Sequence, residues 1–151
     1  MSEITKSDLD FLNVAFEEAK KGYDEGGVPV GSSMSFEDAL LAKGHNKRVQ
    51  NGNPIAHGEM DCISNAGRRA NYNGVTLYTT LSPCMMCSGT IIQFGIKRVI
   101  IGENNNFDGN IEFLRNNGVE VHIVNDKECE NLMTSFIKEK PELWNEDIAE
   151  E

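Results

Sequence analysis

Two short motifs contain the residues of this chain that are best suited to chemistry. They are His57-Gly58-Glu59 and, further along, Pro83-Cys84-Met85-Met86-Cys87. One imidazole and two thiolates suit Zn²⁺, and three protein ligands leave its fourth tetrahedral position open. Water at an open position of zinc has a pKa near ~7, and Glu59 is free to move protons beside it. The motifs therefore predict a catalytic zinc site, one ion per chain, with ligands His57, Cys84 and Cys87 and with Glu59 as the proton shuttle.

Two other kinds of site contain a Cys-x-x-Cys pair. A structural zinc site needs a fourth ligand, but the sequence has no second Cys-x-x-Cys, and its other histidines are His45 and His122. The alternating pattern around His122 is typical of the polar face of a strand. A redox pair leaves the His57-x-Glu59 motif without a role, so the pattern favours the catalytic zinc site.

Charge restricts the class of substrate. The chain of 151 residues has 24 acidic and 14 basic side chains and a net charge of −10. Proteins that bind polynucleotides usually carry a basic patch, because neutralising phosphates supplies much of the affinity. The close basic pairs here are scattered: Lys20-Lys21, Lys47-Arg48, Arg68-Arg69 and Lys97-Arg98. The charge therefore predicts a small neutral substrate and no nucleic-acid partner.

The composition also predicts where the protein resides. No apolar run approaches the ~20 residues that span a membrane. The segment Met1 to Lys6 lacks the apolar core of a signal peptide. Cys62 and Cys129 lie outside the motifs and are predicted to be free, buried thiols, as in a reducing compartment. We expect no membrane association and a location in the cytoplasm, with the nucleus as an additional location.

Periodicity and turn signals predict the elements that position the motifs. Helices are expected over residues 8–22, 56–67, 83–94, 111–117 and 126–140, and strands over 28–36, 39–44, 75–80, 99–101 and 119–124. Ser82 is predicted to cap the third helix with Pro83 at its first position, and Pro141 to end the last one. Both motifs thus fall at helix starts, where the positive helix end favours thiolate.

The order of these elements predicts an α/β fold. Strands and helices alternate after residue 75, which implies right-handed crossovers and parallel pairing. We expect a three-layer αβα architecture with a central, mixed, mostly parallel five-stranded sheet flanked by helices. Residues 1–151 are expected to form a single domain, with residues 141–151 as a C-terminal lid or tail.

Over nearly its full length, the chain resembles the fungal type of cytosine deaminase in the cytidine deaminase superfamily. His-x-Glu and Pro-Cys-x-x-Cys mark the superfamily, whereas Gly44-His45-Asn46 and the tail Trp144-Asn145-Glu146-Asp147-Ile148 indicate the cytosine-specific branch. Further matching segments are Gly22 to Gly31, Thr76 to Cys84 and Ile101 to Phe107.

The resemblance implies a homodimer with the cytidine deaminase-like fold that hydrolyses free cytosine to uracil and ammonia in pyrimidine salvage. It implies that Asn46 and the Gly58 N–H bind the polar edge of the base, and that Asp147 accepts from its exocyclic amine. It also implies further residues that bind or enclose the substrate: Val30, Ser82, Phe107 and Trp144.

Each of these implied roles has an alternative. Asn46 also fits a turn after a strand, and Phe107 equally fits the core. Trp144 and Asp147 belong either to a loose acidic terminus or to a segment that docks over the pocket. A lone Trp in a charged tail favours docking, because tails with nothing to bury stay disordered. A docked tail would act as a lid that excludes water.

Two further hypotheses about function remain. One is a different deaminase of the superfamily, which acts on guanine, a nucleoside or tRNA adenosine. The acidic charge disfavours tRNA, and a lid that closes over the base would leave no room for ribose. The other is a non-enzymatic, zinc-stabilised binding module, which the missing fourth ligand disfavours.

Overall fold

A mixed sheet forms the centre of the computed structural model, which describes residues 2–150. Residues 1 and 151, the ends of the expected domain, lie outside this range. The strands are β1 (Gly31–Phe36), β2 (Ala39–His45), β3 (Thr76–Leu81), β4 (Arg98–Glu103) and β5 (Glu120–Ile123), in the spatial order β2-β1-β3-β4-β5. β1 pairs antiparallel with β2 and β3, whereas β3, β4 and β5 pair in parallel. Only β1 therefore runs against the other strands, which confirms the predicted mixed sheet.

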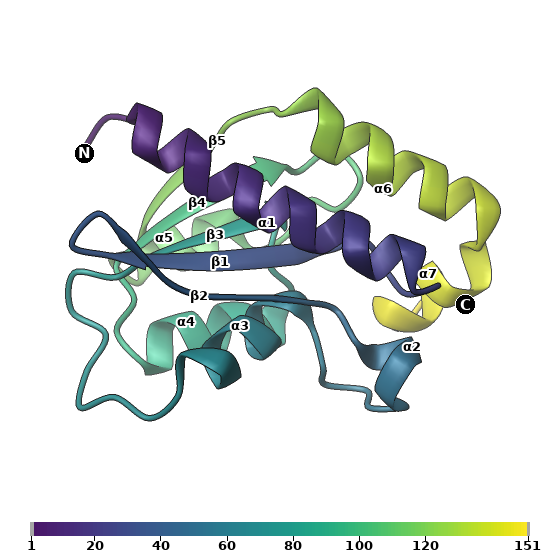
Figure 1. Ribbon diagram of the computed structural model, residues 1–151, viewed down its shortest axis with the longest axis horizontal. Helices are drawn as coiled ribbons and strands as arrows, with labels where there is room; N and C mark the ends of the chain where they lie inside the picture. The colour runs from purple at the N-terminus through teal and green to yellow at the C-terminus, as the bar shows by residue number, and fades with distance from the viewer. Residues whose placement is uncertain (1, 151) are drawn as a thin grey trace.

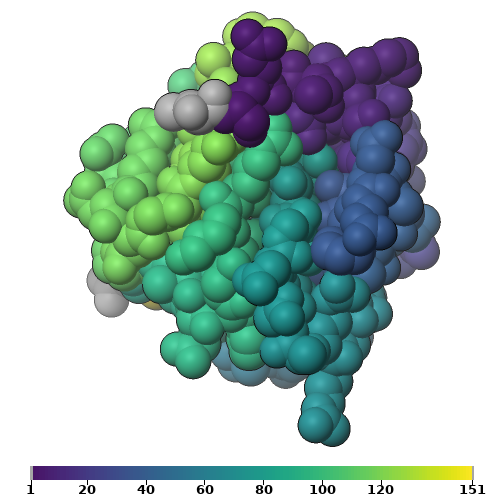
Figure 2. All heavy atoms as spheres, turned by 90° about the vertical axis from the view of Figure 1, so that its left-hand side faces the viewer, coloured from purple at the N-terminus to yellow at the C-terminus, as the bar shows by residue number. Residues whose placement is uncertain are grey.

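Helices cover both faces of this sheet (Figure 1). On one face lie α1 (Lys6–Asp24) and α6 (Lys127–Glu139), and on the other lie α3 (Gly58–Ala66) and α4 (Met85–Gln93). Helix α5 (Ile111–Asn116) packs against α4. Two short helices, α2 (Arg48–Asn51) and α7 (Pro141–Asp147), lie near the end at which β2 stops. Figure 2 shows the opposite end of the molecule, with the β1–β2 turn in blue and the chain around residue 70 in teal. The predicted three-layer αβα arrangement is confirmed.

Local sequence explains where α1 begins and why β4 is an interior strand of the sheet. A capping box begins α1: Thr5 Oγ1 accepts from the Asp8 N–H at 3.1 Å, and Asp8 Oδ2 accepts from the Thr5 N–H at 2.9 Å. Val99, Ile100 and Ile101 in β4 are completely buried, as expected for a strand covered by helices on both faces.

The helix of the Cys-x-x-Cys motif begins later than the sequence predicts. Cys84, and not Ser82, is its N-cap, and the first helical residue is Met85 rather than Pro83. The Ser82 N–H still donates to the Glu103 carbonyl at 3.2 Å, so pairing between the strands keeps the chain extended beyond β3. Cys84 therefore precedes the helix and has an extended backbone.

The C-terminal segment is helical and packed. Pro141 ends α6 as predicted, but it also begins α7, because the first helical position does not require its missing N–H. Trp144 on α7 is only 6% exposed and packs in a cluster with Val30, Leu81 and Phe136. The alternative of a loose acidic terminus is therefore wrong for the described part of this segment.

The structure tests two smaller expectations as well. Cys62 and Cys129 are buried free thiols, as predicted. Within residues 2–150, no helix combines the length and the apolar composition that a membrane span requires.

Gly31 allows α1 to lie close to β1. A Cβ at this position would lie 2.0 Å from the Ala15 carbonyl oxygen and 2.5 Å from the Ala19 nitrogen. Because these are backbone atoms, the helix would have to move away from the sheet. We expect Gly31→Ala to lower the free energy of unfolding by about 3 kcal/mol in urea denaturation.

The neighbouring Ser32 offers a control. Its hydroxyl is buried and has no hydrogen-bond partner within residues 2–150. Removing it leaves no polar group unsatisfied, so Ser32→Ala should change the free energy of unfolding by less than about 1 kcal/mol. Equal losses in the two variants would contradict the explanation based on the α1–β1 approach.

Candidate active site

The three predicted zinc ligands meet at the starts of two helices. His57 is the N-cap of α3, Cys84 is the N-cap of α4, and Cys87 lies in the first turn of α4. One ligand atom from each lies within 4.8 Å of the others. His57 Nδ1 is 3.5 Å from Cys84 Sγ, and tetrahedral zinc with ordinary bond lengths would hold such atoms ~3.6 Å apart. The donor types and their spacing therefore fit one zinc ion.

The electrostatics of these side chains also suit a cation. A hydrogen bond from the Cys87 thiol lowers the pKa of Cys84 to about 4, and this bond together with burial raises the pKa of Cys87. Burial lowers the pKa of His57, but its hydrogen bond with Cys84 and the charge of Asp147 outweigh burial and raise it. The lowered pKa of Cys84 favours its thiolate, which is the form that binds a metal.

Glu59 lies beside the ligands in the first turn of α3. The residue is 3% exposed and lines the same cavity as His57 and Cys84. Burial, followed by the charge of Cys84, raises the pKa of Glu59 to about 7. A carboxyl group with a pKa near neutrality can both accept and donate protons, as the predicted shuttle requires.

His57 and Cys84 line a small cavity near the carboxyl ends of β2 and β3. The residues that line it are Val30, Asn46, His57, Glu59, Leu81, Ser82, Cys84, Phe107, Trp144, Asp147 and Ile148. Every predicted site residue is among them except Cys87 and Gly58, which are buried beside it in the first turns of α4 and α3. The sequence analysis missed Leu81 and Ile148, although each directly adjoins a predicted residue.

Asn46 forms the turn that was one of its two predicted roles, and it also lines the cavity. Its Oδ1 accepts from the Arg48 N–H at 3.0 Å, which forms a turn after β2. Its Nδ2 donates to Asp147 Oδ1 at 2.9 Å, and both residues line the cavity. The turn therefore fixes which end of the amide faces Asp147.

Helix α7 closes the cavity with one carboxylate and one aromatic ring. Burial raises the pKa of Asp147, although the charges of His57 and Arg48 and the hydrogen bond from Asn46 oppose that rise. Trp144 meets Phe107 edge to face, with ring centroids 6.2 Å apart. Phe107 therefore contributes to the cavity wall as well as packing against the neighbouring cluster.

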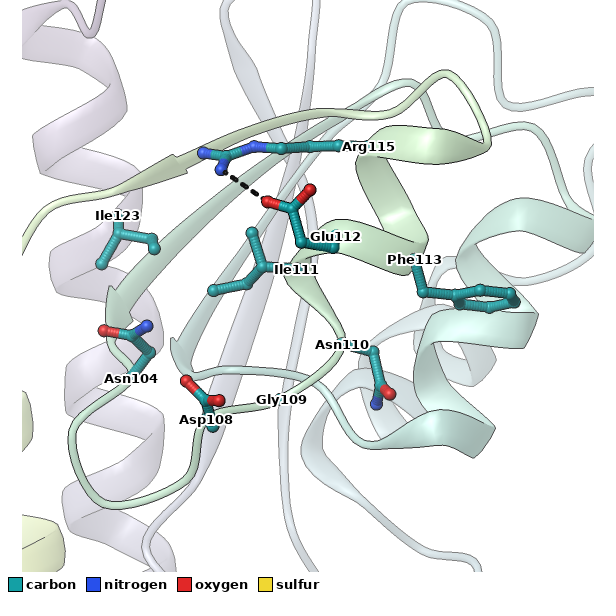
Figure 3. A pocket seen from close by; sticks show the side chains of 9 residues that line it. All are labelled: Asn104, Asp108, Gly109, Asn110, Ile111, Glu112, Phe113, Arg115 and Ile123. Carbon is teal, nitrogen blue, oxygen red and sulfur yellow. Dashed lines mark ion pairs between the residues drawn. The ribbon is translucent and has the colours of Figure 1, made fainter.

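A wider hollow lies elsewhere on the surface (Figure 3). It is lined by the polar loop after β4 and by α5, where Glu112 and Arg115 form an exposed ion pair at 3.6 Å. None of the residues that line this hollow is a histidine or a cysteine. The chemistry of the chain is therefore concentrated in the smaller cavity.

Comparison with known proteins decides the family. Residues 5–103 match the family described as "Cytidine and deoxycytidylate deaminase zinc-binding region". The chain is also 53% identical to the cytosine deaminase of Candida albicans over 150 residues, which cover 97% of this chain and 100% of that protein. The chain belongs to the cytidine and deoxycytidylate deaminase family. Family membership and the His57, Cys84 and Cys87 group confirm the prediction of a catalytic zinc centre.

A further sequence relative and two solved structures with the same fold are also deaminases. A tRNA-specific adenosine deaminase of Buchnera aphidicola is 35% identical over 154 residues, covering 91% of this chain and 92% of that protein. A solved tRNA:A34 deaminase matches 82% of this chain and 99% of its own with a TM-score of 0.73 and 22% identity. A solved guanine deaminase from Nitrosomonas europaea matches 90% of this chain and 86% of its own with a TM-score of 0.72 and 19% identity. These structures confirm the predicted cytidine deaminase-like fold.

Removing one sulfur ligand tests the zinc centre. Cys84→Ala leaves two protein donors, so zinc binding and the stability it contributes should both be lost. We expect elemental analysis to find almost no zinc in the purified variant, and its Tm to fall by roughly 5 °C or more.

Cys129→Ala is the matched control, because Cys129 is a buried thiol outside the donor set. It should retain the zinc content of the wild type. If Cys84→Ala also retained full zinc, Cys84 would not be a ligand.

Proposed function

We propose that this deaminase hydrolyses free cytosine to uracil and ammonia. The observation that carries the proposal is the cavity itself, because His57, Cys84 and Glu59 line it together with the amide of Asn46 and the carboxylate of Asp147. These two groups supply a donor and an acceptor for the polar edge of a base. The 53% identity to the Candida albicans cytosine deaminase supports cytosine as that base.

The proposed roles of the pocket residues follow from their chemistry. The Asn46 amide and the backbone N–H of Gly58 bind the carbonyl edge of the ring. Asp147 accepts from the exocyclic amine, and so favours cytosine over uracil, which has a carbonyl oxygen at that position. Further contacts come from the apolar walls Val30, Phe107 and Trp144 and from Ser82, whose buried hydroxyl has no partner within residues 2–150.

In the proposed reaction, Glu59 moves the protons. Zinc held by His57, Cys84 and Cys87 supplies the Lewis acidity that makes water a nucleophile near neutral pH. Glu59 takes one proton from the attacking water and delivers it to ring N3, as the C–O bond forms at C4. It then transfers the second proton to the amine, and ammonia leaves as the C–N bond breaks. Water is thereby consumed and uracil remains.

The proposal also includes a lid over the cavity, a metabolic role and a location in the cell. Residues 141–150 act as a lid of the single domain, because their helix buries Trp144 and places Asp147 at the cavity. The reaction serves pyrimidine salvage, since its substrate is a free base rather than a nucleotide. The buried free thiols of Cys62 and Cys129 support a reducing compartment, the cytoplasm.

A panel of substrates tests the reaction. Zinc-loaded protein is given cytosine, cytidine, guanine, adenosine and tRNA in parallel, and ammonia release is measured. We expect turnover of cytosine alone. Turnover of tRNA instead would favour the activity named for the Buchnera relative, against the net charge of −10. Inactivity on every substrate would favour a non-enzymatic zinc module.

Glu59→Ala should keep zinc and lose activity. The variant retains all three ligands but has no group to move protons, so we expect kcat for cytosine to fall by roughly 10³-fold or more. Glu17→Gln changes an exposed glutamate of α1 and serves as the control. Near-normal turnover by zinc-loaded Glu59→Ala would contradict the proton-shuttle role.

We also propose that the protein is a homodimer that associates through the α3–α4 layer. Three large apolar side chains in or beside this layer are half exposed: Ile55 at 54%, Met85 at 58% and Phe94 at 50%. Removing this apolar surface from water would stabilise an interface by roughly 25 cal/mol per Å² buried. A second copy of the chain would cover it by a two-fold contact.

A charge placed on this layer should weaken the dimer. We expect Ile55→Asp to shift the protein toward the monomer in sedimentation velocity at micromolar concentration. Leu40→Asp is the control, because Leu40 is also exposed, at 45%, but lies in the β1–β2 hairpin. A wild-type protein that sediments as a monomer would contradict the proposal.

A further inference from the structure

His45 connects the end of β2 to α1 and to its C-cap residue, Glu25, through the two nitrogens of its ring. Its side chain is 3% exposed, with Nδ1 2.9 Å from Glu18 Oε1 and Nε2 2.9 Å from Glu25 Oε1. The two glutamates contact the ring on opposite sides, so together they fix both its position and its orientation.

A glycine in α1 leaves room for the His45 ring. Gly22 lies in α1 between the two glutamates in sequence, and a Cβ there would lie 3.1 Å from His45 Cδ2. On its other side, the backbone N–H of His45 donates to Asp61 Oδ2 of α3 at 3.0 Å. His45 thus connects β2 to α1 and also to α3, the helix that carries Glu59.

The side chain of Gln50 connects Glu25 to Asn46, the residue after His45. Gln50 Nε2 donates to Glu25 Oε1 at 3.1 Å and to the carbonyl oxygen of Asn46 at 3.2 Å. A Cβ at Gly27 would lie only 2.4 Å from Gln50 Oε1, so this glycine leaves room for the side chain. Glu25 therefore accepts hydrogen bonds from both His45 and Gln50.

These contacts hold the backbone of Asn46 from both sides. Its N–H donates to the Val30 carbonyl at 2.9 Å, and its carbonyl accepts from Gln50. His45 itself is not among the residues that line the cavity. Any effect of His45 on the bound base must therefore pass through a neighbour, and Asn46 is the neighbour that reaches the cavity.

We propose that His45, through its hydrogen bonds with Glu18 and Glu25, is a positioning residue that orients the Asn46 amide in the pocket. The inference rests on the proposed function, in which Asn46 binds the carbonyl edge of the base. Asn46 contacts the base before and during the reaction, so its misplacement weakens binding in the ground state and the transition state alike.

Steady-state kinetics test this role. Gln has a nitrogen only at the tip of its side chain, so His45→Gln cannot replace two ring nitrogens that face Glu18 and Glu25 on opposite sides. We therefore expect KM for cytosine to rise about tenfold while kcat changes less than about threefold. His122→Gln is the matched control, because His122 pairs with Glu120 at 2.7 Å on β5 and is not among the cavity residues. This control should leave both constants unchanged. A fall in kcat without a rise in KM would overturn the proposal.

A double-mutant cycle with Asn46→Ala separates positioning from general stability. If His45 acts through Asn46, adding His45→Gln to Asn46→Ala should lower kcat/KM less than about twofold further. Additive losses would mean that His45 acts elsewhere, and would overturn the proposal.

Glu25 provides a second variant if His45→Gln does not fold. Its side chain is 39% exposed, so Glu25→Ala removes the shared acceptor at little cost to packing. We expect KM to rise by about fivefold or more. Asp24→Ala removes the same charge from the adjacent, exposed residue and should leave KM unchanged. Equal KM values in the two variants would contradict the proposal.

NMR of the Asn46 side-chain amide distinguishes this proposal from the proposed function. If the wild type failed to turn over cytosine, the reaction would be wrong, but the position of the amide would still be measurable. His45→Gln should shift the Asn46 side-chain resonances, whereas His122→Gln should leave them in place. Unshifted resonances in His45→Gln would overturn the positioning role.

Discussion

Donor atoms from two helices have to meet within the reach of one zinc ion, and the arrangement of the sheet satisfies this constraint. His57 and Cys84 are the N-caps of α3 and α4, so both helices must begin at the same edge. They do so because β2 and β3 run in the same direction, with β1 antiparallel between them. The single reversed strand thus brings two carboxyl ends, and the helices that follow them, to one side of the molecule.

Burial then gives the residues around the zinc ligands their chemical properties. Glu59 has a pKa of about 7 because it is enclosed, and α7 provides part of the enclosure. The same helix brings Asp147 to Asn46, and their hydrogen bond pairs two polar groups that would otherwise be costly to bury. Closing a site in this way excludes water and strengthens the electrostatic interactions inside it.

The fold alone does not determine the substrate. Solved deaminases of tRNA adenosine and of guanine share this architecture at 22% and 19% identity, as expected when function depends on a site within a common fold. The features that support cytosine here lie outside the zinc motifs, in the turn of Asn46 after β2 and in the packed C-terminal helix. The hydrogen bonds of His45 and Gln50 connect that turn to α1.

The sequence by itself determined the three zinc ligands, the position of Glu59 beside them and the αβα fold class. It could do so because metal-binding motifs, β-branched runs and helical periodicity are local signals. The resemblance also pointed to Asn46 and Asp147. Their contact joins residues 101 positions apart, which only the folded chain brings together. Tertiary structure also overruled a local signal at Ser82, where pairing with Glu103 displaced the expected cap. Likewise, the short acidic segment of α7 is held in place because Trp144 packs against an apolar cluster. The residues of that cluster lie in other parts of the chain, so the periodicity of the segment itself does not predict the contact.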